Sequence, residues 1–385
     1  MRSTLARRLV VIAVPFLCAA LALGLVPRAY CGRDASAWYD GDAELALGLA
    51  QTLIDFEAAD DALLKRPSSD RFVGEWALVT HQMTALGMAQ LCLAHPEQKP
   101  RLLATLTAAA QKTFRPEMRD FGTRAWNEDA LATLGSSHGH AYLAYPALAL
   151  GMARLLGGEL NPALLAQHDA LIAAYERRLL ASPTGLIETY PREAYPTDVA
   201  AVAAAIAVHG RATGTDHAPV LAHWARLVRK HQLDPASGLV IQRMGATDGQ
   251  PHDAPRGSGT GLAAYFAGFA DRSIARELAG ALFRHEASLL GFSAIREYAD
   301  GHSGSGDVDS GPVLFGVSVS ATGFALAPAR AHGRPDVFTR LYRTTDLFGI
   351  GRHGPGARFR FLTGGPIGDA LMLALLTSGP ELAPP

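Results

Sequence analysis

Histidines and carboxylic acids recur in short polar segments, each just before a stretch of the chain that is poor in charge. His140, Glu188, Asp198 and Asp309 are the residues in these segments that we predict to be catalytic. Imidazole and carboxyl groups exchange protons with a substrate near neutral pH when their surroundings adjust their pKa. Two carboxyl groups facing one another can also divide the roles of acid and base. The pattern therefore predicts acid–base chemistry.

Other polar and aromatic residues in the same segments are predicted to bind a small-molecule substrate. They are Glu75, His138, Tyr142, Tyr190, Arg256 and Asp307. Arginines such as Arg256 or Arg243 can neutralise an anionic substrate, or can instead only balance the neighbouring carboxylates. A His-Gly-His sequence at 138–140 suits a metal site only together with further ligands at known spacings, and none is visible. No metal ion and no other cofactor is predicted.

A structural alternative applies to several of these residues. Ser, Thr and Asp commonly cap helices by accepting hydrogen bonds from the backbone amides of the first turn. Asp198 and Asp309 each precede a predicted helix, so capping alone could explain them. In that case the polar segments would stabilise helices without doing chemistry.

Six charge-poor stretches, rich in alanine and glycine, predict the helices that position these residues. They begin near Glu75, His138, Asp198, Gly257, Asp309 and Gly365. Their spacing of about sixty residues indicates a repeated unit of two helices. Helices with small or apolar residues on every side are buried, whereas the charged helices that follow, such as 163–180 and 273–290, have a solvent face. The alternation predicts an all-α fold, an (α/α)6 toroid of six helical hairpins.

Three segments that return from an outer to an inner helix resemble one another. Residues 185–190, 238–243 and 291–298 each begin with glycine and continue with apolar and polar residues. They predict short strand-like loops across one end of the toroid, since turn formers precede two of them. All inner helices would begin at this end, which we call the mouth. The predicted site therefore lies at the mouth.

The composition is that of a folded protein with a large buried interior. Of 385 residues, 49% are hydrophobic and 18% are charged, and the net charge is −1. These values exclude a disordered chain and give no electrostatic basis for binding nucleic acid. A polytopic membrane protein is disfavoured because the outer helices carry too much charge to face lipid. The three cysteines, Cys18, Cys31 and Cys92, form no disulfide framework.

The N-terminus has the pattern of an export signal. Arg2, Arg7 and Arg8 precede an apolar run at residues 9–26. The run is also long enough to remain as a membrane anchor. Residues 1–30 are therefore predicted to be a signal peptide or an N-terminal anchor, and residues 31–385 a single barrel domain. The protein would be exported, either periplasmic or attached to the cell envelope through residues 9–26, in an oligomeric state that the sequence leaves open.

The chain resembles the linalool dehydratase/isomerase family in its repeats, its export signal and one motif. The motif is Gly139-His140 at the start of an inner helix, followed by LALGM at 148–152. The resemblance implies a barrel enzyme that moves protons while a hydroxyl group is lost or migrates, with His140 as the catalytic histidine. That family's two catalytic cysteines would fall near residues 188–198, where Glu188 and Thr197 stand in their approximate places.

Three functions follow from these observations. The first is a dehydratase or isomerase of a small alcohol or isoprenoid-like substrate, in an enclosed cavity lined by Tyr142, Tyr190, Phe266 and Phe315. The second is a carbohydrate-active enzyme (a glycoside hydrolase, a lyase or a uronate epimerase) with paired carboxylates and with Trp76 or Trp126 as aromatic platforms. The third is a non-catalytic envelope protein whose polar residues only cap helices.

Overall fold

The protein is mostly helical. The computed structural model describes residues 13–16, 24, 26–59, 70–132, 138–307 and 310–379. The central helices are α4 (Asp70–Ala94), α7 (Ala144–Leu155), α9 (Pro196–Thr213), α11 (Gly257–Ala270), α13 (Val319–Phe324), α14 (Leu326–Ala331) and α16 (Gly365–Leu376). The peripheral helices are α2 (Ala35–Asp40), α3 (Ala43–Ala58), α5 (Lys99–Lys112), α6 (Pro116–Trp126), α8 (Pro162–Ala181), α10 (Ala218–Leu227), α12 (Arg272–Arg284) and α15 (Pro335–Gly349).

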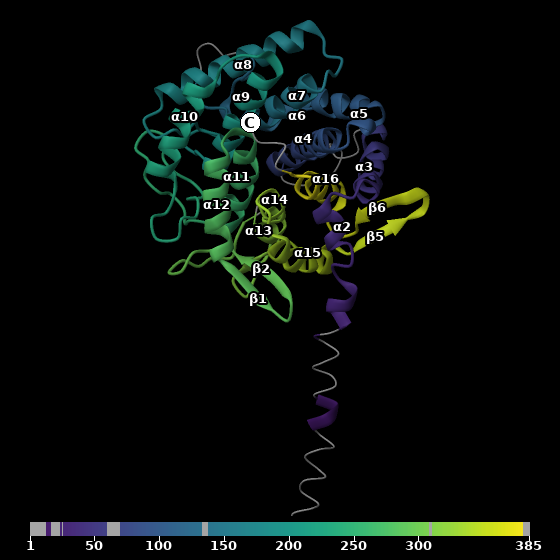
Figure 1. Ribbon diagram of the computed structural model, residues 1–385. Helices are drawn as coiled ribbons and strands as arrows, with labels where there is room; N and C mark the ends of the chain where they lie inside the picture. The colour runs from purple at the N-terminus through teal and green to yellow at the C-terminus, as the bar shows by residue number, and fades with distance from the viewer. Residues whose placement is uncertain are drawn as a thin grey trace, which may run out of the picture.

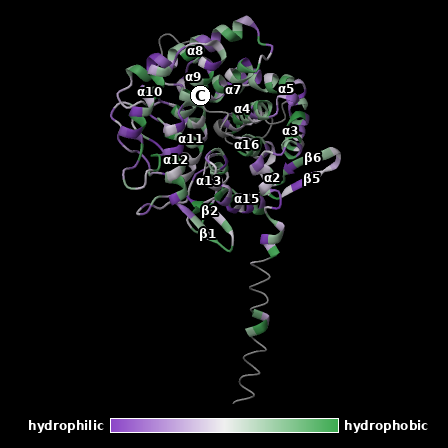
Figure 2. Ribbon diagram, in the orientation of Figure 1, coloured by the Kyte–Doolittle hydropathy of each residue, from purple (hydrophilic) through white to green (hydrophobic). Residues whose placement is uncertain are grey.

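The central helices pack against one another in a closed circuit (Figure 1). Helix α4 packs on α7, α7 on α9, α9 on α11, α11 on α13 and α14, α14 on α16, and α16 packs back on α4. Every residue of α9 from Val199 to His209 is buried, and six of the ten residues from Val199 to Val208 are alanines, whose small side chains let α7 and α11 approach closely. Figure 2 shows hydrophilic residues along α8, α10 and α12, on the rim of the molecule.

Several predicted helix starts agree with the structure. Helices α11 and α16 begin at Gly257 and Gly365, and α9 begins at Pro196, two residues before Asp198. Two other predicted starts are displaced: α7 begins at Ala144, after a short 3₁₀ turn (Ala141–Leu143) and six residues beyond His138, and α4 begins at Asp70, five residues before Glu75. The fifth predicted start, Asp309, lies outside the described residues, and the next helix, α13, begins only at Val319.

The sequence predicted an all-α fold, but the structure also contains two small antiparallel sheets. One has the order β1-β2-β4-β3, from β1 (Glu286–Leu289), β2 (Phe292–Arg296), β3 (Val313–Leu314) and β4 (Val317–Ser318). The other pairs β5 (Gly351–Gly354) with β6 (Arg358–Phe361). Strand β2 occupies the predicted strand-like segment 291–298. The other two predicted segments form only isolated bridges, such as those between Tyr190 and Glu193 and between Leu233 and Val240.

One large cluster of buried side chains extends from Ala35 in α2 to Leu376 in α16 and joins the central helices to the peripheral ones. In the part of the chain that the structure describes, no helix combines the length and apolarity needed to cross a bilayer. The apolar run predicted as an anchor, residues 9–26, lies largely outside the described residues.

Candidate functional site

A cavity of about 530 Å³ opens where α4, α7, α9 and α11 begin. Its volume is within the usual range for sites that enclose a small molecule. Seven aromatic residues line it: Trp76, Phe121, Tyr142, Tyr145, Tyr190, Tyr195 and Phe324. Five acids line it as well: Glu75, Glu193, Asp198, Asp253 and Asp307. Gln82, Thr189, Thr197, Gln242, Arg243, Ser258 and Ser320 add further polar groups.

The return loops before the inner helices form one connected layer around this cavity. A tight turn places Tyr190 and Glu193, because the Glu193 N–H donates to the Tyr190 carbonyl at 2.9 Å. The Met244 N–H donates to the Ala194 carbonyl at 2.9 Å, which ties the first loop to the second. The Gly257 N–H donates to the carbonyl of Glu297 at 2.7 Å, which ties the second loop to the third. Backbone hydrogen bonds therefore hold the polar side chains of three loops in fixed relative positions.

Asp198 is a carboxyl group in the first turn of α9 that faces the cavity. The residue that caps α9 is Tyr195, whose side chain makes no capping bond, so the structure does not use Asp198 as the N-cap. Its carboxylate accepts hydrogen bonds from the Tyr145 hydroxyl and, at 2.5 Å, from the Thr189 hydroxyl. Burial raises the pKa of Asp198 above its ordinary value, and the two hydrogen bonds oppose this shift only in part. Burial therefore favours a protonated Asp198.

Two stacked tyrosines form another part of the cavity lining. The Tyr190 hydroxyl donates a hydrogen bond to Glu75 of α4, and the Tyr190 ring stacks on that of Tyr142, with centroids 6.4 Å apart. The Tyr142 ring lies against Gly122 of α6, where a β-carbon would be only 2.2 Å from the ring. The Tyr142 hydroxyl is buried and has no hydrogen-bond partner among the described residues. Burial raises its pKa, so it remains a neutral phenol.

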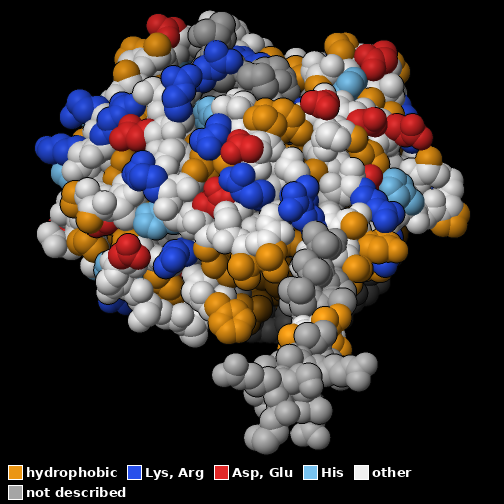
Figure 3. Space-filling model, turned by 60° about the horizontal axis from the view of Figure 1, so that its bottom comes forward, with side chains coloured by type: hydrophobic (Ala, Val, Ile, Leu, Met, Phe, Trp, Pro, Cys, Tyr) orange, Lys and Arg blue, Asp and Glu red, His pale blue; other side chains and the backbone are white. Residues whose placement is uncertain are grey.

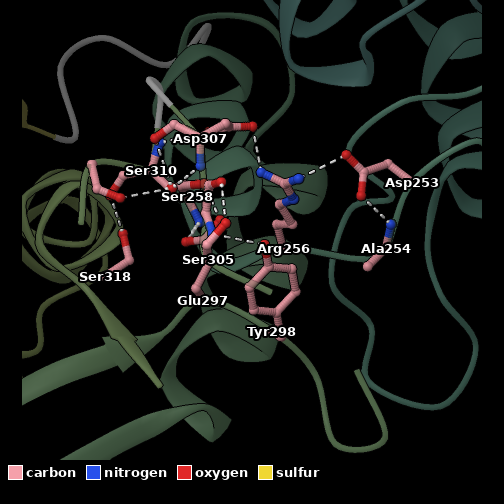
Figure 4. Close-up of polar contacts among 12 residues, drawn as sticks. Asp253, Ala254, Arg256, Ser258, Glu297, Tyr298, Ser305, Asp307, Ser310 and Ser318 are labelled. Carbon is pink, nitrogen blue, oxygen red and sulfur yellow. Dashed lines mark hydrogen bonds and ion pairs between the residues drawn. The ribbon is translucent and has the colours of Figure 1, made fainter. Parts of the chain in front are cut away.

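Arg256 is not one of the lining residues, but it joins two of the lining acids (Figure 4). Its guanidinium donates to Asp253 at 2.8 Å and to Asp307, and it lies 5.4 Å from the centre of the Tyr298 ring. Burial works against the positive charge, but the two carboxylates outweigh it and raise the pKa of Arg256. Arg256 is thus paired with two carboxylates of the protein, which agrees with the second alternative from the sequence, that arginine balances neighbouring carboxylates.

Glu297 is a fully buried acid that sequence reasoning did not single out. It accepts hydrogen bonds from the hydroxyl of Ser258 at 2.6 Å and from the Ser258 N–H at 3.2 Å, and Ser258 lines the cavity. Burial raises the pKa of Glu297. Glu193 and Asp253 were also missed, although Glu193 lies within the polar segment 188–198 and Asp253 shortly precedes the start of α11.

Arg243 is a cation that lines the cavity without a carboxylate bonded to its Nε. That Nε is buried and has no hydrogen-bond partner among the described residues, while Nη2 makes a long contact of 3.4 Å with the carbonyl of His252. Arg243 is therefore a positively charged residue of a lining that is otherwise rich in acids.

The structure separates His140 from the cavity. Its side chain is fully buried, its Nε2 is 2.6 Å from Glu128, and its ring lies 4.4 Å from that of Trp126. Burial lowers the pKa of His140 in spite of the nearby Glu128. His138 is exposed and meets the edge of Trp126.

The other predicted residues divide between the cavity and its surroundings. Glu75, Tyr142, Tyr190, Asp198 and Asp307 line the cavity together. Glu188 is half-buried outside the lining, where its carbonyl accepts the Ala141 N–H at 3.0 Å, and Asp309 lies outside the described residues. Two aromatic residues expected in the lining are elsewhere: Phe266 is buried in the core, and Phe315 is fully exposed on the β3–β4 turn.

A group of potential metal ligands lies away from the cavity, among the described residues of α8 and α9. One atom from each of His168, Asp169 and His209 lies within 4.8 Å of the others. Asp169 is already bonded to Arg154 as well as to His209 at 3.0 Å. Ion pairing therefore accounts for this group without a metal.

Comparisons with known proteins are sparse. No protein-family model matches the chain, and no curated protein matches it. Among solved structures, a family 105 glycoside hydrolase from C. acetobutylicum ATCC 824 superposes with a TM-score of 0.45 at 10% sequence identity, over 77% of this chain and 92% of that chain. The resemblance to the linalool dehydratase/isomerase family gains no support from these comparisons.

Proposed function

We propose that the chain is an acid–base enzyme that cleaves a small carbohydrate-like substrate in this cavity, with Asp198 as the general acid. The observation that carries the proposal is a carboxyl group of raised pKa that lines an aromatic and acidic cavity. We also infer that the closed circuit of helices is an (α/α)6 toroid with the cavity at its mouth, as the sequence predicted.

The polar groups of the lining favour a hydroxylated substrate over an isoprenoid-like alcohol. An apolar substrate would displace water from five acids and Arg243 without replacing their hydrogen bonds, which is unfavourable. Sugar hydroxyls can pair with those groups. Trp76, which is 45% exposed at the cavity, offers an apolar face to a sugar ring.

The arrangement of acids also favours carboxylate chemistry. Among the described residues, no histidine and no cysteine lines the cavity. Asp198 would donate a proton to the leaving oxygen, while a second lining carboxylate would act as base or nucleophile. Glu193, which accepts from the Tyr195 hydroxyl at 2.9 Å, and Asp307 are the candidates for that second role.

The test is turnover of a panel of small glycosides and oligosaccharides by the full chain, with products identified by mass spectrometry. Asp198→Asn keeps the shape of the site and removes the proton, so the rate should fall by about 10²–10⁴-fold. The ligand-induced rise in melting temperature should persist. Asp120→Asn, at an exposed acid on α6, is the matched control and should leave the rate unchanged. A wild-type rate in Asp198→Asn would refute the assignment, as would turnover of apolar alcohols alone.

Tyr145→Phe tests the same acid through its pH dependence. Removal of the hydroxyl takes away a donor that stabilises the ionised form of Asp198. The pKa of Asp198 should then rise further, by about one unit if the bond is worth 1.5 kcal/mol. The limb of the kcat/KM profile that requires protonated Asp198 should move to higher pH. An unmoved profile would mean that Asp198 is not the acid.

A further inference from the structure

Large hydrophobic side chains are exposed around the point where the N-terminal residues reach the folded body. They are Val26, Tyr30, Leu289, Leu290, Leu347 and Phe348, with exposures from 44% to 75%, and we call them the basal apolar face. Scattered exposed leucines are ordinary, but a contiguous group marks a surface that something covers. These six come from three segments that are far apart in the sequence.

Direct contacts bring the three segments together. The Gly32 N–H donates to Asp346 of α15 at 2.9 Å, and Arg343 of α15 donates to the carbonyl of Gly291, in the β1–β2 turn, at 2.9 Å. A β-carbon at Gly291 would lie 3.1 Å from Nε of Arg28. The N-terminal residues therefore lie between the β1–β2 turn and the end of α15. Figure 3 shows hydrophobic side chains gathered on this side of the molecule.

The β1–β2 turn presents its leucines at a conformational cost. Leu289 pairs with Phe292, so Leu290 and Gly291 form a two-residue turn, with φ of 52° and 84°. Turns of this type favour Asn-Gly, since a bulky residue is strained at positive φ. Leu290 is nevertheless leucine and is 61% exposed. A strained, exposed apolar residue indicates a role outside the turn itself.

Arginines surround the same face. Arg28 and Arg33 are exposed, and the Arg33 guanidinium lies 4.5 Å from the centre of the Tyr30 ring. Burial and the positive charges of Arg28 and Arg340 lower the pKa of Arg343, so these cations lie close to one another. Arginine beside aromatic and aliphatic side chains is typical of surfaces at the headgroup level of a bilayer with anionic lipids.

The sequence that precedes this face indicates which partner covers the face. The apolar run at residues 9–26 ends in the face itself, at Val26. A segment with that hydrophobicity is held by a lipid bilayer if it is retained, and the few residues up to Gly32 keep the body close to it. We propose that the basal apolar face lies on a lipid bilayer, with the leucines of the β1–β2 turn inserted among the lipids.

The test measures hydrogen exchange of the full chain with and without vesicles of phosphatidylethanolamine and phosphatidylglycerol. Vesicles should slow exchange roughly threefold or more in residues 286–292 and 343–351, and leave the end of α8 near Leu180 unchanged. Leu180 is 55% exposed on another part of the surface and serves as the internal reference. Equal exchange of the turn with and without vesicles would overturn the proposal. Protection that appears without vesicles and grows with protein concentration would also overturn it, because a second copy would then cover the face.

Leu290→Asn separates lipid contact from folding. Asparagine suits the positive φ of this position, so the variant should be at least as stable as the wild type to urea. If the leucine inserts, residues 286–292 of the variant should nevertheless exchange at about the same rate with vesicles as without them. Leu180→Asn is the matched control and should keep full protection of the turn. Full protection in Leu290→Asn would refute insertion of the turn.

Discussion

The lowered pKa of the buried His168 can be tested through the pH dependence of the free energy of unfolding. The side chain is fully buried under α7, and its Nε2 lies 3.0 Å from the carbonyl of Ala147. Burial first, and then the nearby positive charges of His209 and Arg154, lower the pKa of His168 from 6.5 to about 4. The neutral ring donates its Nε2 proton to Ala147. His168→Gln keeps a donor at a similar reach but cannot titrate, so it isolates the effect of protonation.

The sign and size of the effect follow from the two pKa values. The unfolded chain protonates His168 near pH 6.5, whereas the folded protein resists until about pH 4. The unfolded state therefore binds more protons in this window, and stability falls as the pH falls through it. The shift of about 2.5 units corresponds to about 3 kcal/mol at 1.36 kcal/mol per unit. His168→Gln should be less stable than the wild type at pH 7, and this deficit should shrink by about 3 kcal/mol by pH 4.

The measurement is urea unfolding followed by circular dichroism at pH values from 4 to 7.5. Most other groups titrate alike in both proteins, so their contributions cancel in the difference between the two unfolding free energies. His138→Gln, at an exposed side chain, controls for the loss of a histidine as such. If the difference between wild type and His168→Gln stays constant to within about 0.5 kcal/mol across the range, the inferred exclusion of charge is refuted.

Two other substitutions test the packing around the site. Burial raises the pKa of Asp369 to about 6, although the Phe361 N–H, which donates to this carboxylate at 2.7 Å, opposes the shift. The folded protein therefore loses stability as the pH rises from about 4 to 6. Asp369→Asn should be more stable than the wild type by up to about 3 kcal/mol at pH 7 and should show no gain below pH 4. Equal urea midpoints at pH 7 would contradict this. Gly122→Ala drives a methyl group into the ring of Tyr142 and should cost about 1–3 kcal/mol and weaken ligand binding, whereas Gly268→Ala, with nothing within 4 Å, should be neutral or stabilising. Similar melting temperatures for the two variants would rule out the steric argument.

The buried helices were predictable because the residue types on every side of each helix are enough to indicate burial. Helices α9, α11 and α16 contain small or apolar residues on every side, which requires a buried position whatever their neighbours are. Gly257 and Gly365 marked two starts correctly. The same reasoning placed a helix start at Asp309, ten residues before α13, because the strands β3 and β4 between them are only two residues long and leave no alternation to detect.

The two sheets and the hidden acid depend on contacts that a single sequence does not display. The strands β5 and β6 follow α15, and β6 packs on α3, where the Thr52 hydroxyl donates to the carbonyl of Phe359, 307 residues further along the chain. Glu297 looks like a polar residue at the end of a strand. It is buried against the start of α11, where the Ser258 hydroxyl donates to it. Charged residues are rarely buried, so sequence reasoning assigns such a residue to the surface.

Asp198 and His140 were predicted by the same argument, yet only Asp198 lines the cavity, and the reason lies in the backbone. Asp198 stands in the first turn of a helix that α7 and α11 hold on both sides, so its direction follows from the helix axis. His140 stands in a left-handed conformation, with φ of 61°, and the loop turns its ring toward Glu128 and Trp126. Among the described residues the cavity therefore presents carboxyl groups and phenols, without imidazole. A carboxylic acid supplies a proton near neutral pH only if its surroundings raise its pKa, and burial at the foot of α9 raises that of Asp198.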